Sequence, residues 1–266
     1  MKSGYIMDRI NDSTFECSPS LLNKSEAFEL CVVMPAYNEA AAIYNNIISA
    51  SKIISESFDS YRIIVVNDGS KDSTFREIKK ACDEDSHITY ISYEPNGGKG
   101  KAIATGVVYA VAKYIAFLDS DLELPPDMLK DFYSELISKN ADIAIGSKMH
   151  PDSQLEYPAI RRFLSMGYYV LLKLMFHLKL KDTQTGIKLF KSDVIKPICE
   201  SLNTYGYAFD IEILAKANKK GYSIIEMPIR LHYNRDRAEK SRFSFKVIMK
   251  IFKETISVKK TLKGYK

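Results

Sequence analysis

The sequence lacks the features that mark a disulfide scaffold, a zinc site or a membrane-spanning helix. Its four cysteines are far apart and follow no C-x-x-C spacing, which argues against disulfide bonds and zinc ligation. No run reaches the ~18 uncharged apolar residues that a membrane span needs. The nearest run, Phe163 to Leu180, is interrupted by Lys173, His177 and Lys179. These absences indicate an intracellular protein whose helices do not cross a membrane.

A secretory signal peptide is also missing from the first 29 residues. Charged and polar side chains are scattered through this stretch, and no continuous apolar segment follows them. We interpret residues 1–29 as a leader that is tethered to the folded domain or partly ordered.

The composition is that of an ordinary globular protein, with an uneven distribution of charge. The 266 residues are 46% hydrophobic and 27% charged, and the net charge is +5. Residues 230–266 contain 12 basic and 3 acidic side chains, a net charge of +9, so the rest of the chain carries about −4. The basic character therefore belongs to the C-terminal end, and it predicts an anionic partner there.

Short apolar runs alternate with longer amphipathic stretches from Leu30 onward. This order predicts an α/β domain over residues 30–243, with a mostly parallel sheet flanked by helices and a ligand crevice at the carboxyl ends of the strands. The expected strands are Leu30–Met34, Tyr61–Val66, Ile88–Tyr93, Tyr114–Leu118, Ala141–Ile145 and Ser223–Met227. The second half adds expected helices at Arg161–Leu180 and Asp210–Lys220 and a loop at Lys181–Gly186.

Three carboxylates, Asp119, Asp121 and Glu123, follow one of the expected strands at spacings of two residues. On an extended segment they would point the same way. Such a cluster repels itself unless a cation is present, and oxygen ligands without His or Cys select Mg²⁺ or Mn²⁺. Since Mg²⁺ usually shares its shell with substrate phosphates, the pattern favours a nucleotide-diphosphate ligand. The alternative is a solvated acidic loop before a helix near Pro125.

Polar residues also follow the first two expected strands. Tyr37 offers a ring face for a base, and Glu39 and Asp68 offer acceptors for base N–H groups and ribose hydroxyls. The alternative is structural: Asn38 could cap a helix that begins at Glu39, and the segment around Asp68 could be an ordinary turn.

The glycine-rich segment Asn96–Lys101 matches neither of the common phosphate-binding loops. It lacks the first Gly and the Ser or Thr of the P-loop, and Ile103 stands where the third Gly of a dinucleotide-binding loop belongs. An ATPase or dinucleotide dehydrogenase is thus disfavoured. Two interpretations stay open: a cradle for a diphosphate that uses Lys99 and Lys101, and a flexible turn.

Taken together, these motifs resemble family 2 glycosyltransferases with the GT-A fold, and among them the dolichyl-phosphate or polyprenyl-phosphate hexose synthases. The resemblance covers roughly residues 30–245 and rests on the order of the motifs. They are Val33–Glu39, Val66–Ser70, Asn96–Gly100, Asp119–Glu123, Gly146–Lys148 and Asp182–Gly186. Two further segments, Asp182–Phe190 and Tyr207–Glu212, look most like the glucosyl branch, although the layout also fits the mannosyl branch.

The resemblance implies a GT-A, Rossmann-like fold and a set of site residues. Those implied to bind the nucleotide sugar are Pro35, Ala36, Tyr37, Glu39, Asp68, Lys99, Asp119 and Ser120. Those implied to hold Mg²⁺ or Mn²⁺ are Asp119, Asp121 and Glu123, and the implied phosphate and acceptor contacts are Lys148, Arg162, Arg237 and Lys240. The chain departs from the family's usual residues at Glu123, Lys148 and Glu239.

The acceptor decides whether catalysis needs a base. A lipid phosphate is largely deprotonated at neutral pH and needs none, whereas a sugar hydroxyl needs a positioned base. Asp182 or Asp210 could be that base. We expect a single displacement with inversion, in which Asp121 and Asp182 take part, and we favour the phosphate acceptor.

Two helices bear on a lipid substrate. The expected helix at Arg161–Leu180 has a narrow polar stripe on an apolar surface, which suits core packing as well as membrane contact. Residues 244–266 form a basic amphipathic helix of the kind that binds an anionic membrane surface, or else a solvated one.

Three functions therefore remain. The first is a metal-dependent transferase on the cytoplasmic face of a membrane that moves glucose or mannose from UDP-glucose or GDP-mannose to polyprenyl or dolichyl phosphate. The second is a soluble family 2 enzyme that glycosylates a hydroxyl of a glycan or cell-envelope polysaccharide. The third is a non-enzymatic binding module, which the carboxylate cluster disfavours. No nucleic-acid partner is expected, because a basic and aromatic binding motif is missing.

Overall fold

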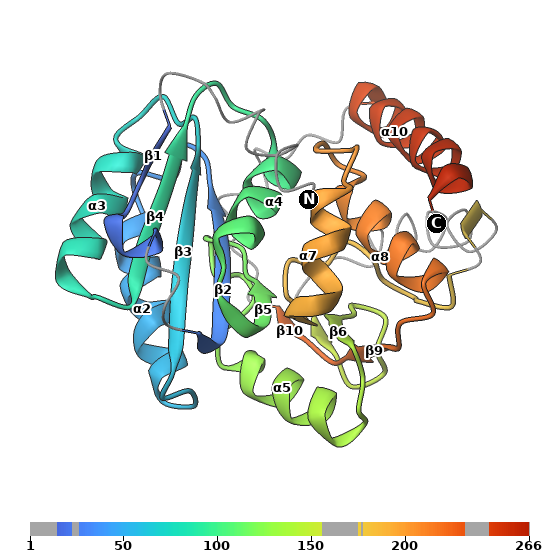
Figure 1. The fold of residues 1–266 in the computed structure, drawn as a ribbon, viewed down its shortest axis with the longest axis horizontal. Helices are drawn as coiled ribbons and strands as arrows, with labels where there is room; N and C mark the ends of the chain where they lie inside the picture. The colour runs from blue at the N-terminus through green and yellow to red at the C-terminus, as the bar shows by residue number, and fades with distance from the viewer. Residues whose placement is uncertain (1–14, 23–26, 156–174, 177, 232–244, 266) are drawn as a thin grey trace.

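The computed structural model is built around an eight-stranded sheet, and it describes residues 15–22, 27–155, 175–176, 178–231 and 245–265 (Figure 1). The strands in spatial order are β1 (Glu16–Cys17), β4 (Ile88–Tyr93), β3 (Tyr61–Asp68), β2 (Phe28–Ala36), β5 (Ala112–Phe117), β8 (Lys188–Lys191), β6 (Ile143–Gly146) and β9 (Ile224–Met227). A second, parallel pair consists of β7 (Gln154–Leu155) and β10 (Arg230–Leu231).

The sheet is mostly parallel, as the sequence predicts. β2 pairs in parallel with β3 and β5, and β3 pairs in parallel with β4. β8 is antiparallel to both of its neighbours, β5 and β6. This strand was not expected, because it is only four residues long and has a lysine at each end.

Helices cover both faces of the sheet (Figure 1). On one side lie α2 (Ile43–Ser55), α3 (Thr74–Glu84) and α5 (Met128–Ser138), and on the other lie α4 (Lys99–Tyr109), α7 (Ser192–Glu200) and α8 (Phe209–Lys219). Alternate residues of β2 serve the two sides: Val33 packs with α4 and α7, whereas Val32 and Met34 pack with α2 and α5. A strand buried on both faces reads as a continuous apolar run, which explains why β2 was recognisable.

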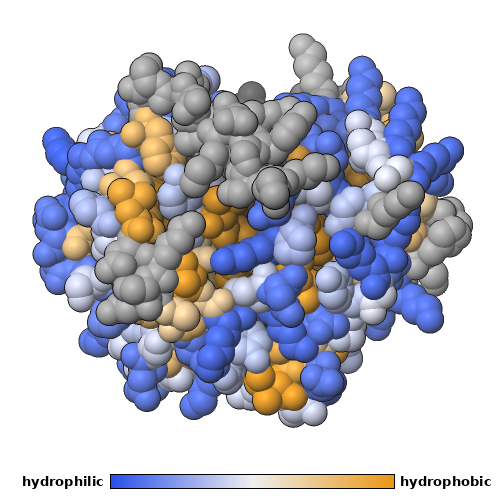
Figure 2. Space-filling view, viewed as in Figure 1, coloured by the Kyte–Doolittle hydropathy of each residue, from blue (hydrophilic) through white to orange (hydrophobic). Residues whose placement is uncertain are grey.

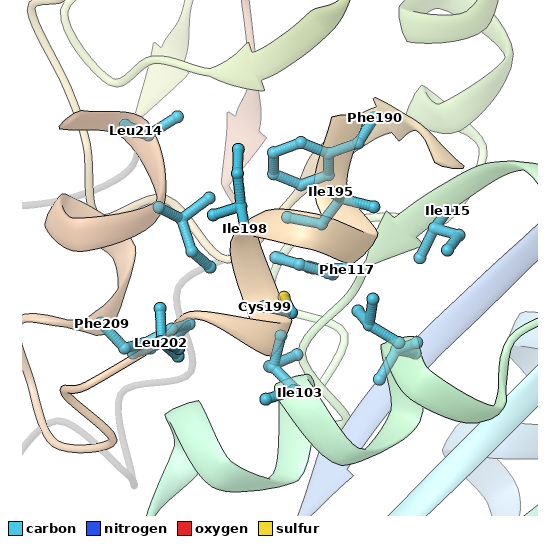
Figure 3. Close-up of a cluster of buried hydrophobic side chains, with 14 of the residues drawn as sticks. Ile103, Ile115, Phe117, Phe190, Ile195, Ile198, Cys199, Leu202, Phe209 and Leu214 are labelled. Atoms are coloured by element: carbon cyan, nitrogen blue, oxygen red, sulfur yellow. The ribbon is translucent and has the colours of Figure 1, made fainter. Parts of the chain in front are cut away.

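The core on the α4 and α7 side is drawn in Figure 3. Ile195, Ile198 and Cys199 of α7 point towards side chains of β5, β8 and α4. Leu214 of α8 belongs to the same cluster. This packing fixes the second half of the chain, including the start of α8, against the first half.

The C-terminal helix α10 (Phe245–Gly264) packs on α8. Glu254 accepts a hydrogen bond of 3.1 Å from the Ala208 amide at the start of α8, and Lys219 Nζ donates one of 2.6 Å to the Leu262 carbonyl. Val258 is fully buried, whereas Met249 and Phe252 are each 39% exposed. The helix therefore uses one face to join the fold and leaves another face outside.

The predicted boundaries agree with the structure to different degrees. α8 spans Phe209–Lys219 where Asp210–Lys220 was expected. Most of the helix predicted at Arg161–Leu180 lies outside the described residues, and Leu178–Leu180 are not helical. In the predicted leader, a short 3-10 helix η1 (Pro19–Leu21) follows β1, which pairs with β4.

The cysteines and the helix lengths bear on two predictions, that disulfide bonds and membrane-spanning helices are absent. All four cysteines are free thiols, and burial raises the pKa of Cys31 to about 12. In the part of the chain that the structure describes, none of the helices combines the length and the apolar character that a membrane span requires.

Candidate active site

The polar loops that the sequence singled out meet at one edge of the sheet. β2, β3, β4 and β5 are adjacent and parallel, so their carboxyl ends lie side by side. The loops after Ala36, Asp68, Tyr93 and Phe117 all leave from this edge. The topology therefore places these loops next to one another at the carboxyl ends of the strands, where the sequence predicts the site.

The loop after β2 is braced against the loop after β3. Asn38 has a φ of 54°; its amide donates to Ser70 Oγ at 3.1 Å, and its Oδ1 accepts from the Lys71 amide at 2.8 Å. Asn38 thus does not cap a helix, since α2 begins only at Ile43. Pro35 and Ala36 end β2, and the Glu39 amide is held by Thr74 Oγ1 at 2.7 Å.

Tyr37 leaves this braced loop with its side chain in the open. It is 46% exposed, one of the few large hydrophobic side chains of the described residues with that much exposure. A rigid backbone with an accessible ring face is what stacking on a nucleobase requires.

Asp68 is buried, and its carboxylate is bound by the loop that follows β4. It is 3% exposed, and its carboxylate accepts hydrogen bonds from Tyr93 Oη at 2.7 Å and from Asn96 Nδ2 at 2.8 Å. The amides of Gly97 and Gly98 donate to the same carboxylate, each at 2.8 Å. These four donors bind both carboxylate oxygens, so Asp68 anchors the neighbouring loop.

This anchoring settles what the glycine-rich loop does with its amides. Gly97 and Gly98 give their N–H groups to Asp68, so these groups are not turned to a diphosphate. Gly98 has a φ of 89°, a left-handed conformation that favours glycine. The loop fixes the start of α4, and its contribution to the site comes from the Lys99 side chain.

Lys99 and Asp119 form an ion pair at the centre of this edge. Lys99 Nζ lies 2.5 Å from Asp119 Oδ1, and the side chains are 40% and 32% exposed. Burial by itself would raise the pKa of Asp119, but the ammonium groups of Lys99, Lys188 and Lys148 hold it below its usual range. Asp119 is therefore ionised at neutral pH.

The expectation that Asp119, Asp121 and Glu123 point the same way is wrong. β5 ends at Phe117, Leu122 has a φ of 54°, and the Glu123 amide donates to Asp121 Oδ1 at 3.2 Å. The segment is a turn, not an extended strand, so the alternation of side chains does not apply. Within the described residues, no three His, Cys, Asp or Glu side chains gather as a metal site.

The donor chemistry of this turn still fits Mg²⁺ or Mn²⁺. Asp119 is ionised and partly exposed, and the turn provides oxygen ligands without His or Cys. Mg²⁺ typically takes one or two protein carboxylates and completes its shell with water and substrate phosphates. Ser120, which is 7% exposed, is held in place by its carbonyl, which accepts a hydrogen bond of 2.9 Å from Asn46 Nδ2.

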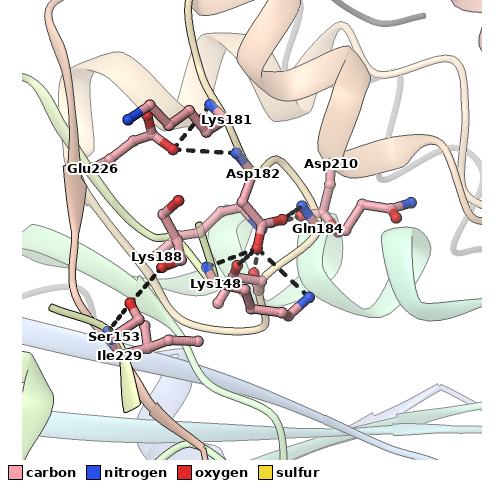
Figure 4. A network of polar contacts seen from close by, with 11 residues as sticks. Lys148, Ser153, Lys181, Asp182, Gln184, Lys188, Asp210, Glu226 and Ile229 are labelled. Atoms are coloured by element: carbon pink, nitrogen blue, oxygen red, sulfur yellow. Dashed lines mark hydrogen bonds and ion pairs between the residues drawn. The ribbon is translucent and has the colours of Figure 1, made fainter. Parts of the chain in front are cut away.

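Asp182 lies at the centre of a polar network (Figure 4). Its carboxylate accepts from the Lys148 amide at 3.0 Å, the Gln184 amide at 3.0 Å and Thr185 Oγ1 at 2.8 Å. The Lys148 ammonium is 3.6 Å away. Burial would raise the pKa of Asp182, but Lys148 and these donors lower it. The expected catalytic carboxylate is therefore a weak base that shapes its own loop.

A buried ion pair, Lys188–Asp210, holds the backbone of this loop. Lys188 Nζ lies 2.6 Å from Asp210 Oδ1 and donates to the Thr185 carbonyl at 2.5 Å. The two side chains are 2% and 10% exposed. Sequence reasoning missed Lys188, although a lysine within the apolar segment Ile187–Phe190 was the available signal.

Two more residues place the loop: Glu226, which the sequence analysis did not single out, and Gly186, which ends the predicted motif Asp182–Gly186. Glu226 of β9 accepts hydrogen bonds from the Lys181 and Asp182 amides at 3.0 and 3.1 Å. A Cβ on Gly186 would come within 2.2 Å of Asp119 Oδ2, so only glycine lets the loop lie against that carboxylate. These contacts join the Asp182 loop to the Lys99–Asp119 pair.

Three of the predicted cationic contacts, Arg162, Arg237 and Lys240, lie outside the described residues. Of the other charged residues, the structure brings Lys99, Asp119, Lys148 and Asp182 together. The buried pair Lys188–Asp210 lies next to them. Charges of opposite sign alternate through this cluster. Such a site can bind an anionic ligand, such as a diphosphate, together with a divalent cation.

Comparisons with known proteins show which proteins this chain resembles. Residues 31–199 match the family model described as glycosyl transferase family 2. A dolichyl-phosphate beta-glucosyltransferase of Saccharomyces cerevisiae is 32% identical over 247 residues, which cover 84% of this chain and 74% of the yeast protein. One from Dictyostelium discoideum is 30% identical, over 79% of this chain and 69% of its own length.

Among solved structures, a glucosyl-3-phosphoglycerate synthase of Mycobacterium tuberculosis, in complex with Mn²⁺, UDP and phosphoglyceric acid, has the same fold. It aligns with a TM-score of 0.61 and 19% identity, over 88% of this chain and 81% of that one.

Proposed function

The chain belongs to glycosyl transferase family 2 and is a glycosyltransferase, and on that premise we propose that it transfers glucose from UDP-glucose to a polyprenyl phosphate. The transfer is a single displacement with inversion, it depends on Mg²⁺ or Mn²⁺, and it takes place at the cytoplasmic face of a membrane. The names of the yeast and Dictyostelium relatives support glucose and the lipid phosphate. UDP and Mn²⁺ in the mycobacterial structure support the donor and the metal.

One observation carries the choice of acceptor: the two carboxylates that could act as a base are already engaged. Asp182 accepts three hydrogen bonds and has a lowered pKa, and Asp210 is paired with the buried Lys188. A sugar hydroxyl would need one of them as a base. A phosphate monoester is already ionised and needs none. This arrangement supports a phosphate nucleophile.

The donor fits along the edge of the sheet that the loops occupy. The exposed ring of Tyr37 offers a face for the base, and Lys99 offers an ammonium for the diphosphate. Asp119 and Asp121 would hold the metal ion, which would neutralise the charge of the leaving diphosphate. The Lys148 side chain lies 3.6 Å from the Asp182 carboxylate and is 30% exposed, so it can contact the acceptor phosphate.

The outer face of α10 supports action at a membrane surface. Met249 and Phe252 are each 39% exposed, and Lys250, Lys253, Lys259, Lys260 and Lys263 are exposed on the same helix. The surface over α10 is predominantly hydrophilic in Figure 2. Exposed apolar side chains among lysines suit an anionic bilayer surface.

The proposed reaction is tested with purified protein, polyprenyl phosphate and labelled UDP-glucose or GDP-mannose, with and without Mn²⁺. We expect label in the organic-extractable lipid from UDP-glucose only, and only with the metal. Asp121→Ala should lower this transfer at least ~100-fold, because the leaving diphosphate loses charge stabilisation.

Asp127→Ala is the matched control, since Asp127 pairs with Arg230 and both side chains are about half exposed (50% and 46%). It should transfer at the wild-type rate. Label from GDP-mannose would correct the donor. Label that appears only on added glycans would overturn the phosphate acceptor in favour of a hydroxyl.

A further inference from the structure

The position of Lys99 is unfavourable for a cation unless it has a specific partner. Lys99 is the first residue of α4, where the helix dipole places partial positive charge and disfavours an ammonium group. Its partner in the structure is Asp119 Oδ1, at 2.5 Å. This oxygen belongs to the residue that is proposed to bind the divalent cation, so the ammonium and the metal would compete for the same carboxylate.

The backbone beneath Lys99 is held firmly, so only the side chain is free to change partners. The Gly100 amide donates to the Tyr205 carbonyl at 3.0 Å, and a Cβ on Gly100 would come within 2.7 Å of Phe209 Cβ. Before Lys99, the Gly97 and Gly98 amides are bound to Asp68. At 40% exposure, the Lys99 side chain itself has room to turn from the carboxylate to a ligand.

We propose, on the basis of the proposed function, that Lys99 is a counter-ion latch on Asp119. Without a donor, the Lys99 ammonium occupies the carboxylate oxygen and opposes metal binding. When a nucleoside diphosphate arrives, its phosphate oxygens attract the ammonium, which leaves Asp119 and frees that oxygen for the divalent cation. No bond is made or broken in this exchange, and one charge pair replaces another.

The latch makes the binding of metal and diphosphate cooperative. If the diphosphate removes the competitor for Asp119, it raises the affinity for the metal, and by linkage the metal raises the affinity for the diphosphate by the same factor. A metal ion without a diphosphate would have to displace the ammonium itself. The site therefore binds the cation weakly until the diphosphate of the donor draws the Lys99 ammonium away from Asp119.

The test measures Mn²⁺ binding to the full chain by electron paramagnetic resonance, with and without UDP. The wild type should bind Mn²⁺ weakly alone and at least ~5-fold more tightly with saturating UDP. Lys99→Met should bind Mn²⁺ alone at least ~5-fold more tightly than the wild type, and UDP should enhance that affinity less.

Lys101→Met is the matched control. Lys101 is on the same helix and carries the same charge, but its Nζ lies 4.3 Å from the centre of the Tyr93 ring and does not pair with Asp119. This variant should keep the Mn²⁺ affinity and the UDP enhancement of the wild type. Circular dichroism and the urea midpoint check that both variants are folded.

The outcomes separate the latch from the proposed function. Equal Mn²⁺ affinity and equal UDP enhancement in the wild type and Lys99→Met would overturn the latch, while metal-dependent glucosyl transfer would still stand. The same change in Lys101→Met as in Lys99→Met would also overturn it, because general charge would then explain the effect. Failure of all three proteins to bind Mn²⁺ in the presence of UDP would overturn metal dependence and the latch together.

Discussion

The ammonium of Lys188 lies 2.6 Å from the carboxylate of Asp210, and the two side chains are 2% and 10% exposed. Lys188 comes from β8 and Asp210 from the first turn of α8, so the pair connects the sheet to the second helical layer. Its ammonium also holds the Thr185 carbonyl at 2.5 Å. The loop that lies against Asp119 thus rests on a buried charge pair.

Lys188→Met should destabilise the protein, since it leaves Asp210 buried without its counter-ion. We expect the free energy of unfolding in urea to fall by about 3–5 kcal/mol. Lys191→Met is the control, because the Lys191–Asp142 pair is similar in length, at 2.9 Å, but 28% and 25% exposed. That variant should lose no more than ~1 kcal/mol. Equal losses in the two variants would contradict the importance of burial.

A second prediction tests whether Asp68 anchors the glycine-rich loop or contacts the nucleoside. Asp68→Ala would leave the Gly97 and Gly98 amides without their acceptor, and it should lower the free energy of unfolding by about 3 kcal/mol even without nucleotide. Tyr93→Phe removes one of the hydrogen bonds to Asp68 and should cost about 1 kcal/mol. If Asp68→Ala kept wild-type stability and lost only UDP affinity, the anchoring role would be refuted.

Asp182 makes stability depend on pH. Its pKa is lower in the folded protein, where Lys148 and hydrogen-bond donors outweigh burial. The stabilisation by this carboxylate is therefore complete above its unfolded pKa, ~3.9, and is lost as the pH falls through the lower folded value. The difference in free energy of unfolding between the wild type and Asp182→Asn should be constant from pH 7 to about pH 5 and shrink below about pH 4.

The same variant tests whether Asp182 is a base. Because a carboxylate with a lowered pKa is a weak base, Asp182→Asn should slow transfer through loop geometry and keep the shape of the pH–rate profile. Loss of the acidic limb of that profile would show that Asp182 accepts a proton in the reaction.

The outer face of α10 is the subject of a further prediction. Met249→Ser with Phe252→Ser should lower sedimentation with anionic liposomes at least ~10-fold, because two partly exposed apolar side chains no longer enter the bilayer surface. Ile137→Ser is the control, since Ile137 is 48% exposed on α5, far from α10 in Figure 1. Equal loss in the control, or none in the double variant, would make α10 an ordinary surface helix.

Much of the fold could be predicted from local pattern. β2, β3 and β4 are buried on both faces and read as apolar runs, and their parallel order brings the polar loops that follow them to one edge. The order of the six motifs from Val33–Glu39 to Asp182–Gly186 indicated the glycosyltransferase family, which the comparisons confirm. Residue types and their order determined these conclusions, because each depends on neighbours along the chain.

The roles of individual side chains depended on partners that are distant in sequence. The sequence predicted a ligand contact at Asp68, but it did not show that the Gly97 and Gly98 amides donate to its carboxylate. It predicted three aligned carboxylates, but it did not show the turn at Leu122 or the ion pair of Asp119 with Lys99. Lys188 gained a role only when β8 entered the sheet beside β5. The role of a carboxylate depends on the hydrogen-bond donors and cations that surround it. Only the tertiary structure decided which of these groups lie near each carboxylate, because they come from distant parts of the sequence.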